Sequence, residues 1–115
     1  MPDLFSIQGL QGYLSIVSSR QQLTVANMAN IDTPGYHTQD LDFQTALREV
    51  SDDGSVNLMP AAREIQGLPE RPDGNNVNID RESMQLSETQ LQYQLGVQLI
   101  KERFHELLTA IKEGS

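Results

Sequence analysis

An apolar stripe in the last third of the chain constrains the fold more than any other feature of the sequence. Between residues 86 and 111, seven of the eight positions that follow a four-three heptad step are apolar. This spacing places the side chains on one face of an α-helix. It predicts a helix from about residue 80 to about residue 113, capped by Asn78 or Asp80. The stripe consists of Leu86, Gln90, Tyr93, Val97, Ile100, Phe104, Leu107 and Ile111.

A second apolar row on the same predicted helix consists of Leu91, Leu95 and Leu99. A hairpin of two helices needs one apolar face per helix, so this row predicts a further set of neighbours. The stripe itself has two interpretations: it is the core of a two-helix hairpin, or it is a core that also serves as a seam between assembled molecules. Gln90, its polar member, suits a role in fixing the register.

An N-terminal helix is predicted from about residue 8 to about residue 31. Its heptad row has five apolar members in seven positions and begins with the seam residues Leu10, Leu14 and Val17. The helix is expected to stop before Pro34, and Pro34-Gly35 suits the central positions of a type II turn. The stretch that ends it is either an ordinary helix stop or a motif that fits closely against neighbours. It contains Ala26, Asn27, Ala29, Asn30, Thr33, Pro34, Gly35 and Tyr36.

The middle of the chain, residues 37–78, is rich in turn signals such as Asp52-Asp53-Gly54. Its apolar residues between 41 and 50 predict a short helix or an apolar strip, and residues 55–59 alternate weakly like a strand. We expect an extended, partly ordered loop with at most a small hairpin. The predicted fold class is therefore mainly all-α. The helices of residues 1–36 and 79–115 pair as an antiparallel coiled coil, joined by the loop-rich middle.

The charge of the chain argues against several classes of partner. With 16 acidic and 8 basic residues the net charge is −8, so neither nucleic acid nor an anionic membrane surface is expected to bind. No run of about 18 apolar residues is present, and no membrane span is expected. The N-terminus lacks the basic and apolar regions of a cleavable signal peptide, so any export is expected to use another route.

Catalytic, cofactor and metal sites are not expected. His37, Asp40 and Asp42 are of ligand types, but their spacing matches no known metal loop. Asp52-Asp53-Gly54 and Asp73-Gly74-Asn75 resemble fragments of calcium loops without the later acidic ligand, so we interpret them as turns. No nucleophile–base pattern, phosphate loop or zinc spacing is present.

The motifs taken together resemble one family. Ala26-Asn27-x-Ala29-Asn30 followed by Thr33-Pro34-Gly35-Tyr36 resembles the motif of bacterial flagellar rod and hook proteins. Asp40-Leu41-Asp42-Phe43, the segment from Asn76 to Glu82, and Leu91-x-Tyr93 narrow the resemblance to a subunit of the proximal rod of the basal body. Met28 and Asn78 depart from this pattern, since the family often has Ile and Asp at those places.

The resemblance implies a structural subunit of the flagellar rod. Members of the family pair their terminal helices around a hollow axial tube and assemble helically into the rod, which crosses the periplasm and transmits torque. They leave uncleaved through the flagellar type III export gate. The partners it implies are other copies of the chain, other rod proteins, an adaptor to the inner-membrane ring and the export gate.

With this resemblance, the stretch from Ala26 to Tyr36 is interpreted as an assembly motif, and the C-terminal stripe as both core and assembly seam. The alanines would allow close approach of helices, and the asparagines would hydrogen-bond across helices or to a loop. Leu4, Phe5 and Ile7 form an apolar cluster that is either an export-recognition segment or packing at the helix start. The alternative function is a soluble helical-hairpin adaptor or chaperone; an enzyme is less favoured still.

Overall fold

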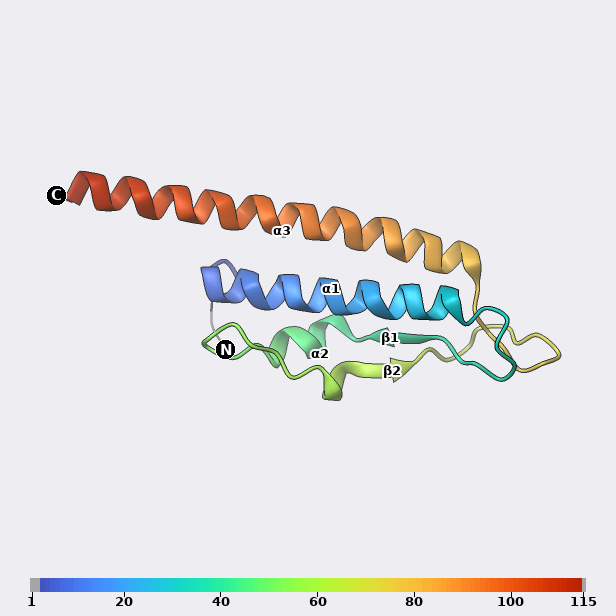
Figure 1. Cartoon of the computed structure of the whole chain (residues 1–115). Coiled ribbons are helices and arrows are strands. Elements are labelled where there is room, and N and C mark those ends of the chain that lie inside the picture. Colours follow the sequence, from blue (N-terminus) through green and yellow to red (C-terminus); the bar gives the residue numbers. More distant parts are fainter. Residues whose placement is uncertain (1–2, 115) are drawn as a thin grey trace.

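The central element of the molecule is α1 (Ile7–Ala29), which has a different neighbour on each side (Figure 1). The long helix α3 (Ile79–Gly114) runs antiparallel along one side, and the middle of the chain covers the other. This computed structural model describes residues 3–114 and measures 68 × 24 × 17 Å along its principal axes. The mainly helical fold with paired terminal helices confirms the predicted fold class.

Polar side chains define the ends of the two long helices. The Ser6 hydroxyl accepts a hydrogen bond of 3.0 Å from the Gly9 N–H and caps the start of α1. The Asn78 side chain accepts hydrogen bonds from the N–H groups of Asp80 and Arg81, so Asn78 is the residue that caps α3. Both helices begin and end within two residues of their predicted bounds.

The middle segment folds back on α1 and contains the small hairpin that was predicted. Strands β1 (Gln39–Leu41) and β2 (Ala62–Glu64) pair antiparallel, with Leu41 opposite Ala62. A short helix follows β1, where a short helix or an apolar strip was predicted. The predicted strand at residues 55–59 is wrong: of its residues Val56 alone pairs, in an isolated bridge with Val50. The elements of this segment are β1 (Gln39–Leu41), α2 (Phe43–Arg48), the 3-10 helix η1 (Met59–Ala61) and β2 (Ala62–Glu64).

The main apolar core lies between α1 and this middle segment. Its buried members are Ile16 of α1 together with Leu41, Ala46, Val50 and Ala61. The contact between α1 and α3 is instead a close approach of the two helices. A methyl group built at Gly96 of α3 would lie 2.6 Å from the Leu14 side chain, so the two helices approach closely where α3 lacks a side chain.

Candidate functional site: a buried polar joint between the helices

The chain leaves α1 through a tight turn that is held by a distant loop. The Tyr36 N–H donates to the Thr33 carbonyl at 3.2 Å, with Pro34 and Gly35 at the two central positions. Gly35 has a φ of 75°, the positive value that a type II turn requires at its second central position. Its N–H donates to the carbonyl of Asp73 at 2.8 Å. The turn is therefore attached to the segment that leads into α3.

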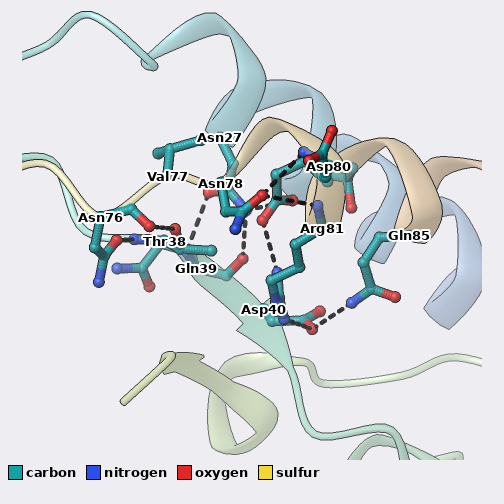
Figure 2. Close-up of polar contacts among 12 residues, drawn as sticks. Asn27, Thr38, Gln39, Asp40, Asn76, Val77, Asn78, Asp80, Arg81 and Gln85 are labelled. Carbon is teal, nitrogen blue, oxygen red and sulfur yellow. Dashed lines mark hydrogen bonds and ion pairs between the residues drawn. The ribbon is translucent and has the colours of Figure 1, made fainter. Parts of the chain in front are cut away.

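Asn27 connects four parts of the chain from inside the molecule, where only 1% of it is exposed. Its Nδ2 donates to the Gln39 carbonyl at 2.8 Å and to Glu82 of α3 at 3.1 Å. Its Oδ1 accepts from the Gln39 N–H at 3.1 Å and from the Tyr36 hydroxyl at 2.9 Å (Figure 2 shows its position). One amide thus joins α1, the turn, β1 and α3, and its hydrogen-bonding capacity is used.

A pair of asparagines from the loop before α3 completes these contacts. The Nδ2 of Asn75, which is fully buried, donates to the carbonyls of Asn30 and Thr33 at 2.9 and 2.8 Å. The Oδ1 of Asn76 accepts from the Thr38 N–H at 2.7 Å (Figure 2). These bonds satisfy backbone groups at the end of α1 and the start of β1, which would otherwise be costly to bury.

Asp40 of β1 is the centre of a buried charged cluster. Its carboxylate accepts from Arg20 at 2.9 and 3.2 Å, from Arg81 at 3.2 Å and from Gln85 at 2.8 Å. Arg81 also donates to Glu82 at 2.6 Å, and the Glu82 side chain is fully buried. Two carboxylates therefore meet two guanidinium groups, so the cluster is balanced in charge. Such a pairing is costly to break, and in some proteins it specifies one arrangement of elements.

We call these interlinked residues the joint: Arg20, Asn27, Tyr36, Thr38, Asp40, Asn75, Asn76, Arg81, Glu82 and Gln85. Of the predicted assembly motif, Asn27 and Tyr36 belong to it directly. Asn30 caps α1 by donating to the Ala26 carbonyl at 2.8 Å, and Ala29 is exposed. Periodicity did not indicate the remaining members. The signal that was available is the row of polar residues at helical spacing, Glu82, Gln85 and Thr89, which normally indicates a solvated face.

The face of α3 toward α1 is this polar row, and the predicted apolar stripe lies beside it. The buried residues of α3 are Glu82, Gln85, Thr89 and Gly96. Within the stripe, Leu86, Val97 and Ile100 are half-buried, whereas Gln90, Tyr93, Phe104, Leu107 and Ile111 are exposed. In the second row, Leu91 and Leu95 are exposed and Leu99 is half-buried. On α1, Leu10 and Val17 are buried and Leu14 is half-buried. Contact between the helices therefore follows the polar row of α3.

The residues that were weighed as metal ligands have other partners. His37 lies 3.2 Å from Glu70 and 3.7 Å from Glu64. Asp42 caps α2 by accepting from the Thr45 N–H, and this hydrogen bond lowers the pKa of its carboxyl group. Within residues 3–114, no group of three or more histidines and acidic residues is placed to hold a metal ion. No helix in the same range has the length and apolar character needed to cross a bilayer.

The N-terminal apolar cluster lies beside α3. Phe5 is exposed, Leu4 and Ile7 are half-buried, and the Phe5 carbonyl accepts a hydrogen bond of 2.6 Å from Arg103. The start of α1 is thus level with Arg103, and α3 continues beyond it.

Tyr36 should make the stability of the chain sensitive to alkaline pH. Burial, and then the nearby carboxylate of Glu82, raises the pKa of Tyr36 above its ordinary value of 10.0. Because the unfolded chain then loses this proton first, the stabilisation is present below pH 10 and is lost as the pH rises through the folded-state pKa. We expect Tyr36→Phe to flatten the fall in unfolding free energy measured by urea titration above about pH 10. An unchanged slope would contradict this role.

Comparison with known proteins gives relatives that match most of the chain. It is 30% identical over 126 residues to the flagellar basal body rod protein FlgB of Escherichia coli K12, covering 91% of each chain. It is 35% identical over 112 residues to the protein of the same name from Cereibacter sphaeroides, covering 86% of this chain and 88% of that one. The FlgB of Yersinia ruckeri is 30% identical over 125 residues. No family model matches the chain.

Proposed function

The chain belongs to the FlgB family of flagellar basal body rod proteins, and we propose that it assembles helically through its terminal helices into the proximal part of a hollow, torque-transmitting rod. It is a rod subunit of the basal body, as its resemblance to rod proteins predicted. Its role is structural and not catalytic.

The observation that carries this proposal is the distribution of side chains around α3. This helix buries a polar row within its own subunit and leaves large apolar side chains in solvent, among them Met84, Leu91, Leu95 and Phe104, each more than half exposed. A monomer would gain stability from the opposite arrangement, because burying a large apolar side chain contributes about 1.5–3 kcal/mol. Exposed apolar rows on two faces of one long helix are expected when neighbouring subunits cover them.

The joint supports the same function because it fixes the shape of the subunit, which neighbouring subunits contact. Its buried charges set the position of α3 along α1, because a shift by one helical turn would separate Glu82 from Asn27 and Gln85 from Asp40. A rod must repeat one subunit geometry many times, and contacts between different surfaces of identical copies build open filaments. In this proposal the assembly motif acts within the subunit, and the apolar rows act between subunits.

The partners in this proposal are other copies of the chain, other rod proteins and an adaptor to the inner-membrane ring. The chain reaches the periplasmic rod uncleaved through the flagellar type III export gate. Leu4, Phe5 and Ile7 are the proposed recognition segment for export. The exposed position of Phe5 supports this, because a recognition residue must be accessible.

Charges placed on the second apolar row test the proposal. We expect Leu91→Glu with Leu95→Glu to leave helix content and unfolding free energy nearly unchanged, within about 0.5 kcal/mol, because both side chains are exposed. In cells with this variant as their only copy, rods and motility should be lost, since carboxylates would be buried against neighbours. The measurements are swimming and immunoblots of isolated basal bodies.

The matched control is Gln94→Glu with Gln98→Glu, which adds the same charge at exposed positions of the same helix. It should retain motility. Normal basal bodies in cells with the Leu91 and Leu95 variant would contradict the proposed role of α3.

A further inference from the structure

The last turns of α3 extend past the start of α1 (Figure 1). They carry large apolar side chains that are exposed to solvent. Four side chains there follow the i, i+3, i+4, i+7 spacing of one helix face, and each is 50–67% exposed. We call this face the ridge: Phe104, Leu107, Leu108 and Ile111. From the first to the last of them it is about 10 Å long, at about 1.5 Å per residue. Most of its apolar surface is uncovered by residues 3–114.

An apolar groove lies elsewhere on the same chain, between α1 and the β1–β2 hairpin. Its volume is about 350 Å³, and Leu23, Leu41, Leu58 and Met59 are among the residues that line it. Met59, 82% exposed, stands at its rim. Flexible Met side chains are common at such contact surfaces because they adapt to a partner.

The groove continues along the free face of α1. One adjoining hollow shares Ser19 with it and a second shares Gln22, and together they extend from Leu14 to Val25. That distance is about 16 Å, enough for the ridge. The small serines at its centre leave room for a second helix to approach closely. No charged residue lines any of the three hollows.

The ridge cannot fill the groove of its own chain. Arg103 is level with Phe5, so Leu107 lies roughly 25–30 Å along the molecule from Gln22, from about 1.5 Å for each intervening residue of α1. A second copy can supply the ridge. Copies that each carry a net charge of −8 repel one another, and two uncharged surfaces are where they can meet with the least repulsion.

We propose that the ridge of one copy occupies the Leu23–Met59 groove of a second copy. This inference rests on the proposed function, because it names one of the contacts through which the rod would repeat. The contact joins two different surfaces, so each copy that donates its ridge keeps a free groove. Burial of the ridge side chains against Leu23, Leu58 and Met59 supplies its free energy.

Disulfide cross-linking tests the contact, and the absence of cysteine from the sequence makes the test clean. A chain carrying Leu107→Cys and Gln22→Cys is expressed as the only copy, and isolated basal bodies are oxidised mildly. A disulfide needs Cα atoms within about 7 Å, so the two positions can join only between copies. We expect covalent dimers and longer ladders, at least about tenfold more than from Leu107→Cys paired with Gln94→Cys.

Each outcome decides one question. Equal dimer from Leu107→Cys alone would show that ridges pair with each other, and no dimer in basal bodies that contain the variant would show that the groove has another occupant; either result overturns this contact. The pair Leu108→Cys and Met59→Cys samples the same contact should the first variant fail to assemble. Absence of the unmodified chain from basal bodies would instead contradict the proposed function itself.

Discussion

Replacing Asn27 by alanine is expected to destabilise the subunit by about 3–5 kcal/mol, more than substitution of an exposed residue. The change removes hydrogen bonds to both backbone groups of Gln39, to the Tyr36 hydroxyl and to Glu82. Each buried group left without a partner costs about 1–3 kcal/mol, and the carboxylate of Glu82 is fully buried. Water has little access to replace the lost amide.

Urea unfolding followed by circular dichroism measures this effect. The control is Asn57→Ala, the same change at an exposed asparagine whose side chain makes one local hydrogen bond to the Met59 N–H. The unfolding free energy of that variant should fall by less than about 1 kcal/mol, because at most one local hydrogen bond is lost. If both variants unfold at the same urea concentration, Asn27 does not hold the joint together.

Replacing Asp40 by alanine is expected to have an effect of similar size, about 3–5 kcal/mol, through charge. Arg20 and Arg81 would lose their shared carboxylate while remaining largely buried, and Gln85 would lose its acceptor. Because the lost contacts hold β1 to both α1 and α3, the loss should appear in the helical signal and not only locally. Thermal unfolding measured by circular dichroism at neutral pH gives the change.

Two further variants separate charge from shape at Asp40. Asp40→Asn keeps the volume and should be less damaging than alanine, since an amide oxygen still accepts from one arginine. Asp42→Ala removes a neighbouring acid that caps the short helix α2 and forms a solvent-accessible ion pair with Arg63. Its cost should be smaller, because a cap and an accessible ion pair contribute less than a buried charge cluster. Equal destabilisation by the Asp40 and Asp42 alanine variants would show that the buried cluster has no special role.

The helices could be predicted because caps, turn residues and apolar spacing are signals that lie within a few residues of one another in the chain. Asn78 was a predicted cap of α3, Pro34 and Gly35 have one favourable backbone arrangement, and the apolar spacing of α2 is visible within a few residues. Strand β2 gave no such signal, because its three residues are all exposed and carry no alternation. Its position depends on pairing with a strand more than 20 residues away in the chain.

Periodicity predicted a helix over α3 but did not show which face meets α1. A hydrophobic stripe indicates that something covers it, without saying whether the cover is the same chain or another. Leu107 and Glu82 illustrate both sides of this ambiguity, since the apolar residue is exposed and the charged one is buried. The burial of Glu82 depends on Asn27 and Arg81 converging in the fold, which spacing alone does not reveal.

In the proposed assembly, α3 uses its polar row within the subunit and its apolar rows between subunits. A density map of isolated basal bodies, at a resolution that shows side chains, measures this directly. We expect Glu82 and Gln85 to keep their contacts with Asn27 and Asp40, while Leu91, Leu95 and the ridge lie against neighbouring subunits. A map in which those leucines face solvent, or in which α3 turns its apolar stripe onto its own α1, would contradict it.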